Sequence, residues 1–149
     1  MDTKDILKKL REDNNMTQEE FADKLLVTRQ AVSRWETGET QPNTETLKII
    51  SREFDISINT LLGSPRQLIC QCCGMPLNED NMISKEPDGS FNEEYCKWCY
   101  SDGKYVYSAK KELIEFLLSH MPNPENLSDE ERSSQYDGYL SQLSHWKQD

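Results

Sequence analysis

The chain has 149 residues, of which 35% are hydrophobic and 30% are charged, and its formal net charge is −10. This length accommodates one ordinary domain or two small ones. No stretch approaches the ~20 apolar residues that span a bilayer, and the charged first residues do not have the pattern of a secretory signal. We therefore exclude membrane and secreted proteins and expect a cytoplasmic protein.

The negative charge is distributed unevenly. Residues 1–62 contain 9 Lys and Arg against 12 Asp and Glu, a net charge of −3, whereas residues 63–149 contain 8 against 15, a net charge of −7. The overall sign argues against a protein that coats nucleic acid through bulk positive charge. The first part can still present a basic face locally, and the acidic second part can serve a protein partner.

The first segment, residues 1–62, shows the pattern of five short helices. Apolar residues recur at helical spacing over Ile6–Leu10, and Thr3 is the expected N-cap of this first helix. Thr17 and Glu20 predict a capping box for the second helix, because each side chain can bond the backbone N–H of the other residue. Short helices with short connections predict an all-α domain with one shared core.

Caps also predict the next three helices. Thr28 begins the third, which ends at Gly38, and either Asn43 or Thr44 begins the fourth. A last short helix spans Ser57–Leu62. The residues expected to face the core of the second to fourth helices are Phe21, Ala22, Leu25, Ala31, Val32, Trp35, Leu47, Ile50 and Phe54.

A linker over residues 63–67, which contains glycine and proline, precedes a different pattern. Over residues 68–107 strand-forming residues are frequent, and Asp88-Gly89 is the signal of a hairpin turn. This segment predicts a small β domain.

Helical spacing returns in the last part, residues 108–149. Ala109–Ser119 predicts a helix, the segment Pro122–Arg132 is expected to be a polar loop, and Tyr136–Trp146 fits a short amphipathic helix. The predicted fold is therefore mostly α, with a five-helix domain, a small β domain and a helical C-terminal extension.

The second and third predicted helices have the spacing of a helix-turn-helix. Because Val32 and Trp35 face inward, the opposite side of the third helix presents polar residues: Arg29, Gln30, Ser33 and Arg34. A helix about 10 Å across fits the major groove of B-DNA. There Arg can bond guanine, Gln can bond adenine and Ser can bond either, while Gln18 can meet a phosphate.

Residues 4–62 resemble the lambda-repressor-like, Xre-type helix-turn-helix domain of bacterial regulators. The resemblance rests on Leu10-Arg11, Thr17–Ala22, Val27–Glu36, Gly38, Pro42 and Leu61-Leu62. It implies that double-stranded DNA is contacted by Gln18, Thr28, Arg29, Gln30 and Ser33, and that the loop near Asn43 contacts phosphate.

The same resemblance implies a buried ion pair between Arg11 and Glu36, the alternative being two solvated charges on helix faces. The sequence departs from the family at the turn position that is often glycine, where Leu26 stands. Leu26 must accept a positive φ or reshape the turn, at a cost of roughly 1–2 kcal/mol.

Four of the five cysteines form two C-x2-C pairs, Cys70 with Cys73 and Cys96 with Cys99, separated by 22 residues. Zn²⁺ prefers four ligands in a tetrahedron, and each pair can supply two thiolates from one tight turn. Because the protein fills all four positions, we expect one structural zinc and no open catalytic position. The segment also has too few apolar residues to fold without metal.

The residues around these pairs resemble a zinc-ribbon domain common in bacteria and sometimes fused behind such a helix-turn-helix. The resemblance rests on Cys70–Leu77, Tyr95–Tyr105 and the tail Tyr139–Lys147, and covers about residues 68–147. It implies a fold and a metal, but little about activity.

Three readings of Cys72 remain open: an alternative ligand, a redox trigger beside the thiolates, or a small residue on the knuckle surface. His120 and His145 are expected to be polar surface residues. Base stacking is disfavoured for the aromatic residues, whose neighbours are acidic, so they are expected to pack a thin core or a partner face: Tyr95, Trp98, Tyr100, Tyr105 and Tyr107.

The chain shows no Gly-rich phosphate loop, nucleophile elbow or His–carboxylate pairing, so we expect no enzyme. The leading hypothesis is a sequence-specific transcriptional regulator on the nucleoid, acting as a homodimer through Ala109–Ser119 or Tyr136–Trp146. Its zinc ribbon would serve assembly, partner docking or sensing. The alternative is an interaction adaptor or antitoxin-like protein whose helix-turn-helix does not read DNA.

Overall fold

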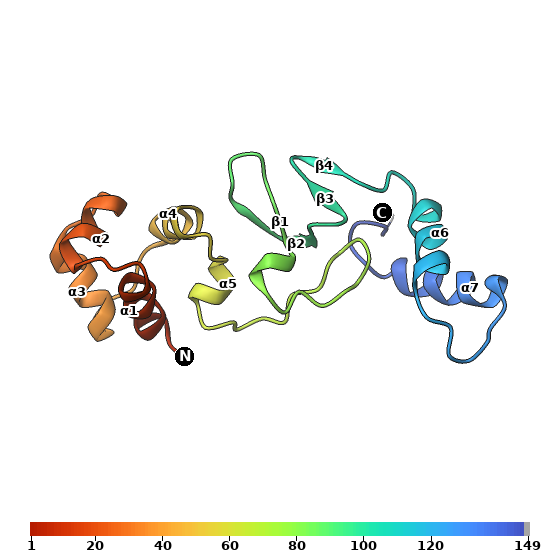
Figure 1. Ribbon diagram of the computed structural model, residues 1–149, viewed down its shortest axis with the longest axis horizontal. Helices are drawn as coiled ribbons and strands as arrows, with labels where there is room; N and C mark the ends of the chain where they lie inside the picture. Colours follow the sequence, from red (N-terminus) through yellow and green to blue (C-terminus); the bar gives the residue numbers. More distant parts are fainter. Residues whose placement is uncertain (148–149) are drawn as a thin grey trace. The chain divides into compact units, whose positions relative to one another are not determined.

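The computed structural model describes residues 1–147, which form two compact units. The first comprises Met1–Gln67 and Gly89–Phe91, and the second comprises Leu68–Asp88 and the chain from Asn92 onward. Among the described residues, no helix has both the length and the apolar character needed to cross a membrane. Each unit has its own architecture (Figure 1).

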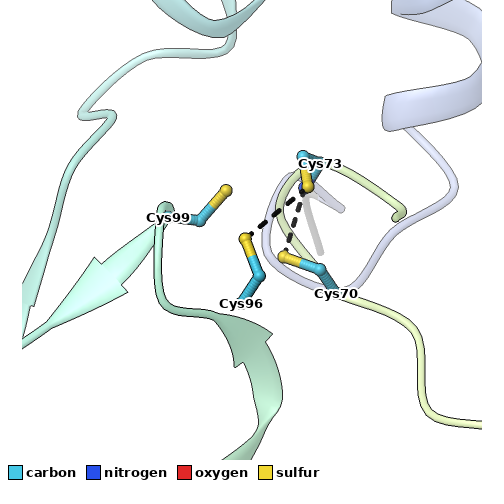
Figure 2. A group of neighbouring side chains, drawn as sticks. All are labelled: Cys70, Cys73, Cys96 and Cys99. Atoms are coloured by element: carbon cyan, nitrogen blue, oxygen red, sulfur yellow. Dashed lines mark hydrogen bonds between the residues drawn. The ribbon is translucent and has the colours of Figure 1, made fainter. Parts of the chain in front are cut away.

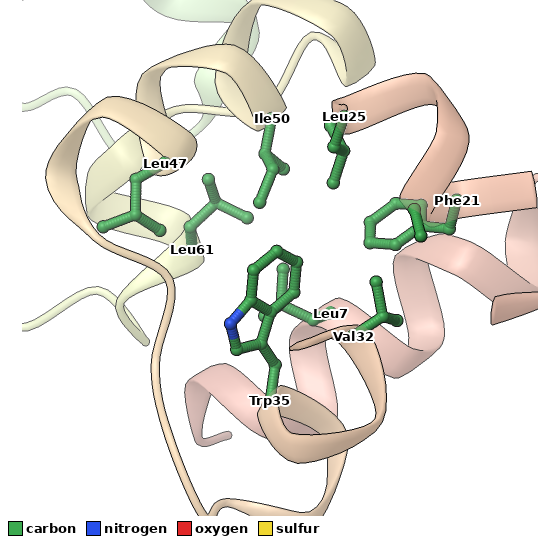
Figure 3. Packing of buried hydrophobic residues seen from close by; sticks show 9 residues of the cluster. Leu7, Phe21, Leu25, Val32, Trp35, Leu47, Ile50 and Leu61 are labelled. Atoms are coloured by element: carbon green, nitrogen blue, oxygen red, sulfur yellow. The ribbon is translucent and has the colours of Figure 1, made fainter. Parts of the chain in front are cut away.

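The first unit is built from helices, as the sequence predicts. They are α1 (Thr3–Asp13), α2 (Gln18–Leu25), α3 (Arg29–Thr37), α4 (Thr44–Phe54) and α5 (Ile58–Leu61). Their buried side chains form one core (Figure 3): Leu7, Phe21, Ala22, Leu25, Val32, Trp35, Leu47, Ile50 and Leu61. Ala31 and Phe54, also predicted to face inward, are only partly buried and pack against this core.

Side-chain capping explains where α2, α3 and α4 begin. At α2 the capping box is complete: Glu20 N donates to Thr17 Oγ1 at 3.1 Å, and Thr17 N donates to Glu20 Oε1 at 3.0 Å. Thr28 caps α3 as predicted, and Asn43 is the cap of α4. The predicted cap of α1 is wrong, because Asp2 holds that position and Thr3 is the buried first helical residue.

The turn between α2 and α3 contains a left-handed leucine. Leu26 has φ 58° and ψ 41°, and its side chain is 90% exposed. Its amide still caps α2 by donating to the carbonyls of Ala22 and Asp23. The turn therefore forms without glycine. Because the Leu26 side chain is exposed, its packing does not offset the strain of the left-handed conformation.

Leu26→Gly is expected to raise the free energy of unfolding of the first unit by about 0.5–1 kcal/mol, since the relief of left-handed strain exceeds the extra chain entropy of glycine. Thermal denaturation of the zinc-loaded protein measures this. Leu26→Ala is the control, because it removes the exposed side chain but keeps the β-carbon, so it should leave stability nearly unchanged. Equal stabilisation by both variants would contradict the strain argument.

The second unit combines short strands with two helices. It contains a 3-10 turn (η1, Asp80–Met82), β1 (Ile83–Lys85) paired with β2 (Phe91–Cys96), β3 (Tyr100–Ser101) paired antiparallel with β4 (Lys104–Tyr105), α6 (Lys110–His120) and α7 (Asp129–Leu140). The predicted turn at Asp88-Gly89 connects β1 to β2, and Gly89 has a positive φ of 88°. The short strands are consistent with a thin β domain.

The C-terminal helices differ from the prediction in their bounds. The segment Pro122–Arg132 was expected to be a loop, but α7 begins at Asp129, because Ser128 accepts a bond from Glu131 N at 3.2 Å and the acidic first turn suits the helix dipole. Buried Arg132 then donates to Leu118 O and Met121 O at the end of α6. The helix predicted over Tyr136–Trp146 is wrong beyond Leu140, where turns follow.

Candidate functional site

The four predicted zinc ligands meet in the second unit (Figure 2). The Sγ atoms of Cys70, Cys73, Cys96 and Cys99 all lie within 4.8 Å of one another. The Cys73 and Cys96 sulfurs are 3.8 Å apart, and a tetrahedron with Zn–S bonds of about 2.3 Å has edges of about 3.8 Å. The donor set and its spacing therefore fit one structural Zn²⁺.

Two tight turns position these sulfurs. In the first, Gly74 N donates to Cys70 O at 2.8 Å, and Gly74 adopts the positive φ of 80° that closes the turn. In the second, Cys96 ends β2, and Cys99 N donates to Cys96 O at 3.1 Å. We call residues 70–74 the first knuckle and residues 96–99 the second knuckle.

The electrostatics of the cluster favour a cation. Hydrogen bonds from the thiols of Cys73 and Cys96 hold the pKa of Cys70 well below its usual range. The pKa of Cys99 is raised, because its thiol hydrogen-bonds to the Cys70 sulfur. The pKa of Cys96 is also lowered, whereas that of Cys73 is raised like that of Cys99. Two thiolates are thus favoured and two are opposed, a conflict that a bound metal ion removes by stabilising every thiolate.

The fifth cysteine does not join the cluster. Within the described residues, the group that can hold a metal comprises the two C-x2-C pairs and omits Cys72. The prediction that Cys72 lies on the knuckle surface is wrong, because its side chain is completely buried.

Three of the aromatic residues pack against one another in the ribbon, as predicted, whereas Trp98 is 52% exposed. Tyr95 stacks on Tyr100 with ring centroids 5.5 Å apart and meets Tyr105 edge-on at 5.2 Å. The prediction for His145 is wrong: its ring lies 4.5 Å from that of Tyr105, and burial lowers its pKa. His120 is exposed as expected, and its ring stacks on Phe116 at 4.1 Å.

A polar surface lies on α3 of the first unit. Val32 and Trp35 are buried in the core, which fixes the rotation of the helix. The opposite side presents exposed Arg29, Gln30 and Arg34, while Ser33 is half-buried. These polar groups can therefore meet a ligand without any change in the core.

The other predicted contact residues lie at helix N-termini. Gln18 is the first residue of α2, while Thr28 and Asn43 are the N-caps of α3 and α4. Thr28 Oγ1 accepts from Ala31 N at 3.1 Å, and Asn43 Oδ1 accepts from Thr46 N at 2.9 Å. Helix N-termini attract phosphate, because free N–H groups and the helix dipole both favour negative charge.

The predicted ion pair ties α3 to α1. Arg11 Nε and Nη2 donate to the two carboxylate oxygens of Glu36 at 2.8 and 2.9 Å, and Arg11 Nη1 donates to Met16 O at 2.9 Å. The side chains are 13% and 6% exposed, respectively. The hydrogen bond to Glu36 also raises the pKa of Arg11.

After α7 the chain makes contacts with the first knuckle that were not predicted from the sequence. Trp146 Nε1 donates to Cys72 O at 2.7 Å, across 74 positions of sequence. The available signal was an apolar residue, Leu143, and a tryptophan in an otherwise polar tail.

Family comparisons agree with both halves of the chain. The family described as "Putative zinc ribbon domain" matches residues 69–147, and a helix-turn-helix family matches residues 7–61. A solved structure of the P22 c2 repressor protein in complex with a synthetic operator is 26% identical and covers 43% of this chain and 97% of that one, with a TM-score of 0.41.

Curated relatives are similar as well. The HTH-type transcriptional activator BcrR of Enterococcus faecalis is 45% identical over 63 residues, 42% of this chain and 31% of that protein. The uncharacterized HTH-type transcriptional regulator YqaE of Bacillus subtilis is 34% identical over 90 residues, 59% of this chain and 78% of that protein. The antitoxin PezA of Streptococcus pneumoniae is 34% identical over 62 residues, 42% of this chain and 39% of that protein. The chain spans about a third of the length of BcrR and of PezA. The family matches show that it belongs to the zinc ribbon domain family through its second half and carries an Xre-like helix-turn-helix domain in its first half.

Proposed function

We propose that this protein regulates transcription by binding specific sites on double-stranded DNA in the cytoplasm, on the nucleoid. In this proposal residues 1–62 form the DNA-binding domain, and residues 63–67 form a linker to the zinc ribbon. Residues 68–107 form this zinc ribbon, which holds one zinc ion, and residues 108–149 form a helical C-terminal extension. Relatives named as transcriptional regulators support the regulatory role.

The observation that carries the proposal is the division of α3 into two sides. Its apolar side is fixed in the core by Val32 and Trp35, so the side chains of Arg29, Gln30 and Ser33 project in a defined direction. Arg and Gln on a helix in the major groove each recognise a base through two hydrogen bonds. Arg34 and the helix N-termini at Gln18, Thr28 and Asn43 would then position the helix on phosphates.

We also propose that the protein acts as a homodimer. One recognition helix contacts only a few base pairs. Regulators usually gain sequence specificity by placing two DNA-binding domains on a repeated site. The predicted interfaces are Ala109–Ser119, which largely coincides with α6, and Tyr136–Trp146. In the structure α6 packs against α7, and Phe116 and Met121 of this region remain exposed for a second copy.

Selection of bound fragments from genomic DNA tests these proposals together. At about 100 mM salt, where non-specific binding is already weak, we expect enrichment of a repeated motif with half-sites one helical turn apart. Arg29→Ala/Gln30→Ala should lose the motif and weaken specific binding about 30-fold or more, since each base contact contributes about 1–3 kcal/mol.

The matched control is Arg52→Ala, which removes the same charge from an exposed position near the end of α4. It should keep the motif and most of the affinity. Equal losses in both variants would indicate a non-specific effect of charge, and no enrichment with wild-type protein would contradict DNA reading. A single unrepeated half-site would contradict the dimer.

The alternative is an adaptor or antitoxin-like protein that binds a protein partner through its acidic second half. The similarity to the antitoxin PezA favours this candidate, as does the net charge of −7 over residues 63–149 (8 basic against 15 acidic residues). Measuring the affinity for DNA at increasing salt concentration distinguishes the regulator from the adaptor. Phosphate contacts make the affinity of a regulator fall steeply with salt, whereas an adaptor does not bind DNA at any salt concentration.

A further inference from the structure

The chain after Tyr139 folds back onto the first knuckle within the second unit. We call residues 139–146 the clamp segment. Four hydrogen bonds join it to the first knuckle: Trp146 Nε1 to Cys72 O at 2.7 Å, His145 N to Gln71 O at 3.3 Å, Ser144 N to Gln71 Oε1 at 3.1 Å, and Tyr139 Oη to Gly74 O at 3.1 Å. All four acceptors lie in the turn that carries the first ligand pair.

Two peptide groups of this turn are held from both sides. Their N–H groups, on Cys72 and Cys73, donate to Cys70 Sγ at 3.4 and 3.5 Å. The carbonyls of the same two peptide groups accept from His145 N and Trp146 Nε1. Because a trans peptide is planar, with its N–H and C=O pointing in opposite directions, each bond to a carbonyl also fixes the direction of an N–H toward the sulfur.

Gly74 permits the close approach of the clamp segment. A β-carbon at this position would overlap the ring of Tyr139, and the φ of 80° also disfavours any other residue. The glycine thus closes the turn and leaves room for the clamp segment to lie directly against the backbone.

We propose that the clamp segment supports the zinc site from outside and slows the loss of zinc, with Trp146 as its main positioning residue. The N–H groups that it orients stabilise negative charge on the Cys70 sulfur, and polarised chains of hydrogen bonds strengthen one another. Groups that orient metal ligands in this way influence metal affinity by about 10–100-fold. This role is independent of DNA binding.

Trp146→Phe in the full chain tests the proposal, because phenylalanine keeps an aromatic ring and removes the donor to Cys72 O. Transfer of zinc to an excess of a chromophoric chelator should be about 10-fold faster than in the wild type. Tyr139→Phe should have a smaller effect, since the Gly74 carbonyl belongs to neither peptide group that points at Cys70. The absorption spectrum of the Co²⁺-substituted protein should remain that of a tetrahedral thiolate site in both variants.

The matched control is Trp98→Phe, the same substitution at a side chain that is 52% exposed between the ligands of the second knuckle. It should release zinc at the wild-type rate. Hydrogen exchange provides a local measurement: Trp146→Phe should speed exchange of the Cys72 and Cys73 amides and leave the Cys99 amide unchanged.

Two results would overturn the proposal: zinc release from Trp146→Phe at the wild-type rate, or equally faster exchange at both knuckles, which would indicate general destabilisation. If Trp146→Phe does not fold, Tyr139→Phe decides. Transfer of zinc from Tyr139→Phe that is faster than in the wild type, by less than about 10-fold, supports the proposal, and transfer at the wild-type rate overturns it.

Discussion

Removal of zinc is expected to unfold residues 68–107 while the helices of the first unit, α1 to α5, stay folded. The strands of the second unit are two to six residues long, too short to be stable without a metal ion held by the two knuckles. Structural zinc supplies about 10–16 kcal/mol of folding free energy in small zinc-finger peptides at neutral pH. The core of the first unit contains no residue from this segment. Amide NMR spectra recorded with and without a chelator measure the effect residue by residue.

Cys96→Ser should reproduce the effect of the chelator by removing one of the four ligands. Its matched control is Cys72→Ser, which changes a buried cysteine outside the ligand group. Cys72→Ser should keep one zinc per chain, whereas Cys96→Ser should lose it. Retention of dispersed signals from residues 68–107 in zinc-free protein would contradict the dependence on metal.

Glu36→Gln is expected to lower the free energy of unfolding of the first unit by about 3 kcal/mol. The substitution keeps the shape of the side chain but leaves the Arg11 guanidinium buried without its counter-charge, and breaking a buried pair in this way costs about 3–5 kcal/mol. Partial exposure of Arg11, at 13%, favours the lower value. Urea denaturation followed by circular dichroism measures the change. The double variant Arg11→Met/Glu36→Leu should lose less stability than the sum of the losses in Arg11→Met and Glu36→Leu.

An exposed ion pair in the same unit provides the control. Lys48 Nζ lies 3.5 Å from Glu45 Oε1, with side chains 58% and 82% exposed. Glu45→Gln should change stability by less than about 0.5 kcal/mol, since exposed pairs contribute little. Similar effects at Glu36 and Glu45 would show that the buried pair is no more important than a solvated one.

Features encoded within a few residues could be predicted from the sequence. The caps at Thr17 and Thr28 depend on bonds to residues three positions away, so the local pattern contains all the necessary information. The zinc ligands could be predicted for a different reason, because the metal restricts both residue type and spacing. The error at Thr3 shows the limit of this reasoning, since α1 begins after Asp2 without any side-chain capping bond.

Features that depend on distant contacts could not be predicted in this way. His145 looks like a solvated residue in the sequence, and only the fold brings it against Tyr105. Arg132 looks like part of a charged loop, yet it is buried because its guanidinium satisfies the last carbonyls of α6. The partner of Trp146 is 74 positions away, and no periodic pattern identifies a contact of that kind.

If the protein binds DNA as proposed, the acidity of its second half would affect how long it stays at non-cognate sites on a chromosome. The first turn of α7 alone presents Asp129, Glu130 and Glu131, and phosphates repel such charges. Most encounters of a regulator are with non-cognate sequence, which outnumbers the true sites by about a millionfold or more. Repulsion shortens each of these encounters, because non-specific retention depends almost entirely on charge. In the proposed function the acidic half would therefore reduce the time spent on non-cognate DNA, while the contacts of α3 would determine the dwell time at the true site.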